Sequence, residues 1–150
     1  GEARSEGVEL EGSFAVTADL RVNFSAAYMD TEVTEIANSL GEVGESLPFA
    51  PQSSASLGVQ YDFEFADYPS FVRADVSYVG EYENGFKSSN FPTSGDYTKV
   101  NVRAGMSLSE SWSLGFYVNN LMGEDATTID EYVDLRVAPR KLGVEMNYSF

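Results

Sequence analysis

The sequence predicts an all-β protein, an antiparallel up-and-down transmembrane β-barrel with about eight strands in this chain. Three observations lead to this prediction. Apolar and polar residues alternate with a period of two, short turns alternate with long polar loops, and the chain ends on an aromatic strand. The ends of soluble chains usually fray into water, so an apolar closing strand is typical of a bacterial outer-membrane barrel.

Seven segments show the alternation clearly, and each places apolar side chains on one face and small or polar ones on the other. In chain order they cover Gly7–Thr17, Leu20–Val33, Gln52–Phe65, Ser70–Gly80, Tyr97–Leu108, Trp112–Leu121 and the closing strand Lys141–Phe150. An eighth strand is expected in the region of Asp134, so the total is seven or eight.

The closing strand has the sharpest pattern. Its apolar residues, counted back from the end, are Phe150, Tyr148, Met146, Val144 and Leu142. Only polar residues or glycine stand between them, which predicts one apolar face. The same pattern would also fit a half-buried strand of a soluble sheet, so this segment does not decide between the two environments by itself.

The connections follow a strict order. Short turns fall at Ala18, Asp67 and Ser109, and long polar loops occupy Thr34–Pro51, Glu81–Asp96 and Met122–Ala138. The first long loop could contain a short helical turn near Glu35–Leu40. Outer-membrane barrels have short periplasmic turns and long extracellular loops, and this order places Phe150 at the periplasmic end.

Composition excludes several classes of protein. The 150 residues fit one domain, and no run approaches the roughly 18 consecutive apolar residues of a membrane helix. The net charge of −15 argues against nucleic acid as a partner, because phosphate binding needs clustered Lys and Arg. The nine Tyr and ten Phe suit strands and the aromatic girdles of a barrel.

The chain has neither Cys nor His, so the common zinc sites and the Ser–His or Cys–His nucleophile arrangements are impossible within it. We therefore expect no enzyme, no catalytic or cofactor-binding residue and no metal site. Asp130, Glu131 and Asp134 could hold calcium, but a solvated acidic loop is the favoured interpretation. No signal peptide is visible, so we expect a mature form or a fragment.

The polar faces bear on which side of the sheet meets water. A soluble lipocalin-like barrel also alternates, with its apolar face inward, and periodicity cannot separate the two. The polar faces here are rich in Ser, Gly and Asn with charges of both signs, which suits a crowded polar interior. Seven residues are candidates for the barrel lumen, mostly as structural pairs and none as a ligand contact: Arg73, Asp75, Lys99, Arg103, Tyr117, Asn119 and Glu145.

Five stretches together resemble the C-terminal barrel of TonB-dependent outer-membrane receptors. They are Arg4-Ser5-Glu6-Gly7-Val8-Glu9-Leu10-Glu11, Leu47-Pro48-Phe49-Ala50-Pro51, Phe116-Tyr117-Val118-Asn119-Asn120-Leu121, Pro139-Arg140 and Tyr148-Ser149-Phe150. Each is weak alone, but their order and spacing span nearly the whole chain. One departure concerns the third loop, where no aromatic follows Asn-Asn-Leu before Tyr132.

The resemblance implies a plugged barrel of about 22 strands, of which residues 1–150 would supply the C-terminal segment without plug or signal peptide. It implies a Gram-negative outer-membrane receptor that takes up a siderophore, cobalamin or glycan. Its partners would be outer-membrane lipid and lipopolysaccharide, a plug domain, TonB and the barrel-assembly machinery. That machinery would read Phe150, Tyr148, Met146 and Val144 as an assembly signal.

Two alternatives stay open. The chain could be a self-contained eight-stranded outer-membrane barrel with a structural or adhesive role, a size that its length fits. It could also be a soluble lipocalin-like barrel that binds a ligand.

Overall fold

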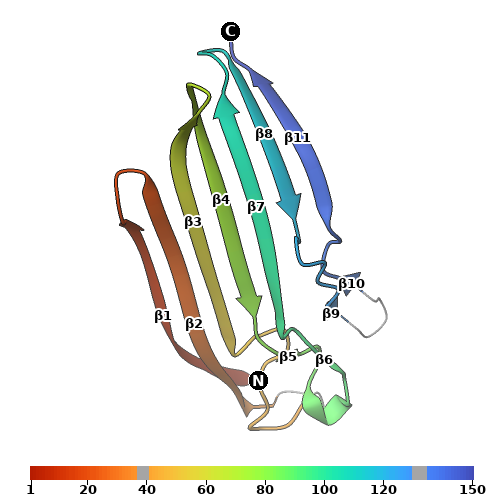
Figure 1. The fold of residues 1–150 in the computed structure, drawn as a ribbon. Coiled ribbons are helices and arrows are strands. Elements are labelled where there is room, and N and C mark those ends of the chain that lie inside the picture. Colours follow the sequence, from red (N-terminus) through yellow and green to blue (C-terminus); the bar gives the residue numbers. More distant parts are fainter. Residues whose placement is uncertain (37–40, 130–134) are drawn as a thin grey trace.

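The computed structural model describes residues 1–36, 41–129 and 135–150, and its main element is one antiparallel sheet of seven strands (Figure 1). The strands are β1 (Glu2–Ala15), β2 (Leu20–Glu35), β3 (Ser53–Phe65), β4 (Tyr68–Val79), β7 (Tyr97–Ser107), β8 (Trp112–Asn119) and β11 (Lys141–Tyr148). Their order in the sheet is their order in the chain, as an up-and-down topology requires.

The predicted alternation becomes one continuous apolar face. Directly opposed residues continue the same face from strand to strand, as in the row Leu57, Val76 and Val100 or the row Phe116 and Val144. A shift of one residue in any pairing would turn a whole strand over. The seven segments therefore agree on one register, and each keeps its apolar side chains on the same side.

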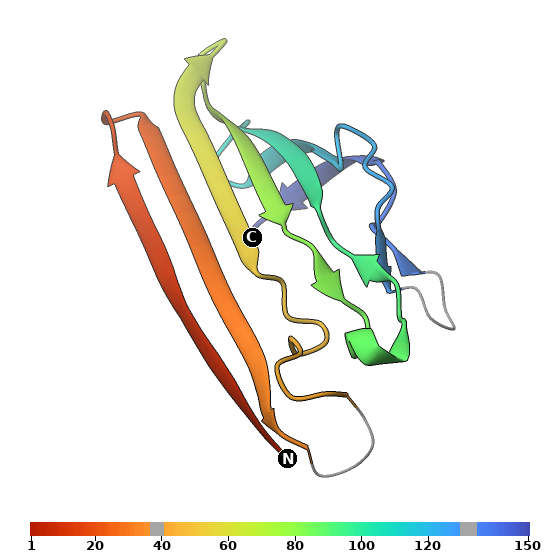
Figure 2. The same ribbon diagram turned by 90° about the horizontal axis from the view of Figure 1, so that it is seen from below.

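The sheet is curved and open, as two views at right angles show (Figures 1 and 2). In the described part of the chain, β1 pairs only with β2 and β11 only with β8, so two edges have no strand partner. The fold is thus a piece of barrel wall. It does not enclose a core as an eight-stranded barrel or a lipocalin would.

The three short connections are tight hairpins. Ala66 and Asp67 both have positive φ, 51° and 67°, which is the signature of a two-residue type I′ turn. The hydroxyl oxygen of Thr17 accepts hydrogen bonds from the backbone N–H groups of Asp19 and Leu20 in the first turn. The hydroxyl of Ser109 performs the same function in the third turn, where it accepts from Ser111 and Trp112.

Strand ends differ from the sequence-based boundaries. β1 starts at Glu2 and not at Gly7. The reason is that β2 continues to Glu35, and β1 pairs with β2 along the whole length of β1. An ion pair of 2.9 Å between Arg4 and Glu32 crosses this extension, where apolar alternation is no longer needed. β4 likewise begins at Tyr68, directly after the two-residue turn.

The eighth strand does not join the main sheet. Near the expected position, β10 (Leu135–Arg136) pairs instead with β9 (Thr127–Ile129) in a separate small hairpin. β10 has only two residues, and Pro139 follows before β11, so this segment is too short to become a barrel strand. Residues 130–134 lie outside the described part of the chain, and with them the acidic group considered for calcium.

The second long loop contains more structure than the sequence predicted. β5 (Tyr82–Glu83) pairs with β6 (Thr93–Ser94), and a 3₁₀ turn, η1 (Lys87–Ser89), lies between them. The helical turn proposed for Glu35–Leu40 is not tested, because residues 37–40 lie outside the described residues. Glu35 itself belongs to β2. No described helix is long and apolar enough to cross a membrane.

Candidate functional site

The apolar face of the sheet is uncovered. Among the described residues only Val33 and Val137 are buried hydrophobic side chains, whereas Val8 and Leu142 are 73% and 74% exposed. At about 25 cal/mol per Å² of apolar surface, such exposure is strongly unfavourable in water. An apolar face that extends over all seven strands is stable only when a second apolar phase, such as lipid, or a large partner covers it.

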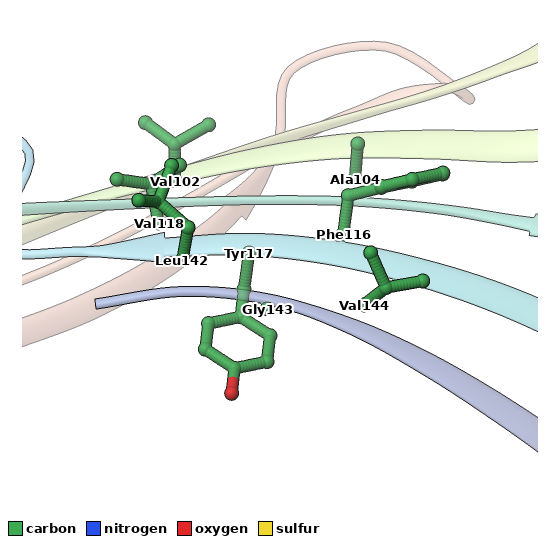
Figure 3. Close-up of a pocket in the computed structure, with 8 residues that line it drawn as sticks. All are labelled: Val102, Ala104, Phe116, Tyr117, Val118, Leu142, Gly143 and Val144. Atoms are coloured by element: carbon green, nitrogen blue, oxygen red, sulfur yellow. The ribbon is translucent and has the colours of Figure 1, made fainter.

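A shallow groove of about 410 Å³ runs along this face over β7, β8 and β11 (Figure 3). The apolar side chains that line it are Val102, Ala104, Phe116, Val118, Leu142 and Val144. Figure 3 shows the ring of Tyr117 pointing to the other side of the sheet. The groove offers hydrocarbon contacts and almost no hydrogen-bonding group, so it suits an acyl chain and not a polar ligand.

The opposite face is polar, and it carries all seven predicted lumen residues. Arg73 and Asp75 come from β4, Lys99 and Arg103 from β7, Tyr117 and Asn119 from β8, and Glu145 from β11. The register puts Arg103 directly between Arg73 and Tyr117, and it puts Glu145 opposite Gly115. The structure therefore brings the predicted residues onto one surface.

Only part of this set forms the structural pairs that the sequence predicted. The guanidinium group of Arg73 donates two hydrogen bonds to the carboxylate of Asp75, at 2.9 and 2.5 Å, and one of 3.1 Å to Oδ1 of Asn23. Among the described residues, neither Lys99 nor Arg103 forms an ion pair. Arg103 and Glu145 line a common depression of about 160 Å³, but no ion pair joins them.

Glycine makes room for the long side chains of the polar face. A Cβ atom on Gly143 would lie 2.2 Å from Cζ of Tyr117, so the phenol ring lies directly over this glycine. Gly58 is covered in the same way by Arg73 and Asn23. Small and large residues thus alternate across neighbouring strands, which is how a sheet accommodates bulky groups on one crowded surface.

The loops at the long-loop end of the sheet contact one another. The phenol of Tyr82 donates a 2.6 Å hydrogen bond to the carbonyl of Thr128, which joins the second loop to the third. Burial raises the pKa of this phenol above its usual value, and neighbouring Tyr97 adds to the effect. The first loop joins the second through Glu45, whose carboxylate accepts from the backbone N–H and hydroxyl of Ser88.

Glu45 shows why that contact depends on charge. Desolvation opposes ionisation of its carboxyl, but backbone N–H donors at Glu42 and Ser88, the Ser88 hydroxyl and Lys87 outweigh it. They leave the pKa of Glu45 below its ordinary value. The ionised form therefore holds the two loops together.

Asn120 has a structural role that the sequence did not predict, although the residue belongs to the Asn-Asn-Leu motif. Its side chain is 2% exposed and φ is 53°, in the left-handed region that Asn tolerates. The side-chain amide donates to the carbonyls of Glu124 and Ala138 and accepts from the backbone N–H of Glu124. It thereby ties the start of the third loop to its end.

Comparison with known proteins places this architecture. A family model described as the β-barrel of TonB-dependent receptor-like proteins matches residues 1–121. The chain belongs to the TonB-dependent receptor family. The members of this family are transport receptors of the Gram-negative outer membrane, each with a plug domain and a partnership with TonB, and the family is not one of enzymes.

Curated relatives of the family point the same way. The chain is 38% identical over 122 residues to the metal-pseudopaline receptor CntO of Pseudomonas aeruginosa, a match that covers 81% of the chain. It spans 17% of the length of that relative. The seven strands thus correspond to a limited part of a TonB-dependent receptor.

Solved structures of the family share the fold. The ferric yersiniabactin uptake receptor FyuA from Yersinia pestis superimposes with a TM-score of 0.83 at 21% identity, over 99% of this chain and 24% of its own. The ferric preacinetobactin receptor BauA from Acinetobacter baumannii gives 0.82 at 20% identity, over 99% and 22%. At these identities the likeness shows the barrel architecture alone.

Proposed function

We propose that this chain forms part of the barrel of a TonB-dependent receptor that takes up a scarce ligand across the outer membrane. The observation that carries the proposal is the continuous apolar face in a chain of this family. A siderophore, cobalamin or a glycan would be such a ligand. The named relative, a metal-pseudopaline receptor, favours a metal bound to a small organic chelator over the other two.

The two faces of the sheet would then have different surroundings. The apolar face would contact outer-membrane lipid and lipopolysaccharide, with acyl chains in the groove of β7, β8 and β11. The polar face would line the lumen and contact the plug domain. The seven residues proposed for that lining are Arg73, Asp75, Lys99, Arg103, Tyr117, Asn119 and Glu145.

The end of the chain would serve barrel assembly. Val144, Met146, Tyr148 and Phe150 have exposed side chains in an alternating series that a folding partner could contact. The rings of Trp112 and Tyr148 lie 4.7 Å apart, which anchors β11 to β8. We assign these four residues to recognition by the barrel-assembly machinery.

Uptake by the full-length receptor tests the proposal. In cells that lack the receptor gene, the full-length gene should restore accumulation of a metal–chelator complex, and deletion of TonB should abolish it. Cobalamin and a glycan serve as competing ligands in the same assay. Accumulation that persists without TonB would contradict the proposal and favour a self-contained barrel, an alternative that the open seven-stranded sheet already disfavours.

A further inference from the structure

The charges of the polar face are distributed unevenly. On β1, β2 and β3 this face carries the acids Glu9, Glu11, Glu35, Asp62 and Glu64 against one cation, Arg21. On β7, β8 and β11 it carries Lys99, Arg103 and Lys141 against one carboxylate, Glu145. A basic strip of this kind is unexpected in a chain with a net charge of −15.

One row of directly opposed residues shows the contrast residue by residue. The row runs Arg21, Gln60, Arg73, Arg103, Tyr117, Gly143 across the strands from β2 to β11. Arg21 has its own carboxylate in Asp62, at 2.5 Å, and Arg73 has Asp75. Arg103 is the third arginine of the row and forms no ion pair with any described residue.

The described residues offer Arg103 one nearby carboxylate, that of Glu145, which lines the same depression but forms no ion pair with it. Arg73 and Arg103 are direct cross-strand partners, and like charges so placed repel each other. The carboxylate of Asp75 is already occupied by Arg73, and the side chain of Asn101 accepts the backbone N–H of Asn120. An anion from outside the sheet would relieve this repulsion.

The depth of Arg103 favours a protein partner. Ser107, the end of β7, lies four positions after it, and Tyr97 lies six positions before it. At about 3.3 Å per residue, it lies roughly 13 Å from the short-turn end and roughly 20 Å from the long-loop end. In a barrel of this class the lumen at that depth is filled by a plug. A wall cation that becomes covered must then be paired.

We propose that Arg103, supported by Lys99, is a docking point for carboxylate groups of the plug domain. The inference rests on the proposed function, since it needs the polar face to line a plugged lumen. The described residues form barrel wall and its loops, so the plug that would meet Arg103 belongs to another part of the receptor. Charge complementarity selects an acidic segment of the plug as the group that covers Arg103 and Lys99.

Hydrogen–deuterium exchange of the purified full-length receptor tests this docking. Arg103→Gln with Lys99→Gln should raise the exchange rate of at least one Asp- or Glu-bearing plug segment about tenfold or more, while the barrel strands keep their protection. Arg21→Gln is the matched control, because this arginine lies in the same row but already has Asp62. It should leave plug exchange unchanged. Heat-dependent gel migration shows that each variant is folded.

A charge exchange adds a second readout. Arg103→Glu should loosen the plug further, and a basic residue in place of the affected plug carboxylate should restore its protection. Unchanged plug exchange in the Arg103 and Lys99 variants would overturn the inference, as would weaker ligand binding without any change in the plug. TonB-dependent uptake by the wild-type receptor is measured in parallel. Its absence would refute the proposed function, whereas its presence with unchanged plug exchange would refute only the docking.

Discussion

Individual residues decide how the loops are held. Asn119 and Asn120 are adjacent and chemically identical, yet Asn119 is exposed on the polar face while Asn120 is almost fully buried. The sequence predicted a lumen-facing position for Asn119 and gave Asn120 no role beyond their shared motif. Their difference arises because Asn120 turns the chain at positive φ, which directs its amide into the loop and not into the lumen.

Substitution of these two residues gives a matched comparison. Asn120→Ala removes three side-chain hydrogen bonds, each worth about 1 kcal/mol, and places alanine at positive φ. We expect the third loop to open more easily by roughly 3 kcal/mol, measured as hydrogen-exchange protection in the full-length receptor. Asn119→Ala should change it by less than about 0.5 kcal/mol. Equal effects would mean that the amide of Asn120 is not the link between the loop ends.

At the scale of elements, the period-two pattern predicted the seven strands of the main sheet and the faces of their residues. It missed the first residues of β1, where charged side chains and not apolar ones are paired across the strands. It also missed β5, β6 and the β9–β10 hairpin, whose two- or three-residue strands are too short to show any period. These short strands form because two neighbouring segments pair with each other. The residue pattern within one segment does not predict such pairing.

The face assignment of β11 can be tested with one charge. Val144→Arg places a cation on the apolar face, and we expect about 2–4 kcal/mol of lost stability if the residue is near the middle of the membrane. The measurement is reversible denaturant unfolding of the full-length receptor in lipid. Asn147→Arg on the same strand points to the polar face and should cost much less. A larger loss for Asn147→Arg would mean that the faces are reversed.

On the scale of the whole molecule, the seven strands form a wall without a core. Two strand edges are open, and one face exposes large apolar side chains. Lipid would cover the face, but it cannot satisfy the backbone groups of a free edge. The stability of this sheet therefore depends on strands that the described residues do not supply.

The 150-residue chain on its own should not persist as a monomeric open sheet. We expect it to associate with further copies, aggregate or close into a small barrel, because unpaired strand edges recruit partners. Light scattering after size-exclusion chromatography in detergent gives the mass, with the full-length receptor as reference. Exchange protection of β1 and β11 distinguishes closure from an open form. A stable monomer with both edges unprotected would contradict this expectation.

The sequence by itself determined the class of fold, the two faces, the alternation of short and long connections and the family. The fold class, the faces and the connections follow from local periodicity and turn chemistry, which each segment carries independently of its neighbours. The family follows from the resemblance of five short motifs. Only the tertiary structure decided that Asp75 pairs with Arg73, that Arg103 forms no ion pair with a described carboxylate, and that Asn120 joins the ends of a loop. The Arg73–Asp75 pair lies within one strand, but the position of Arg103 beside Arg73 depends on the register between β4 and β7, and register is fixed only when the whole sheet forms.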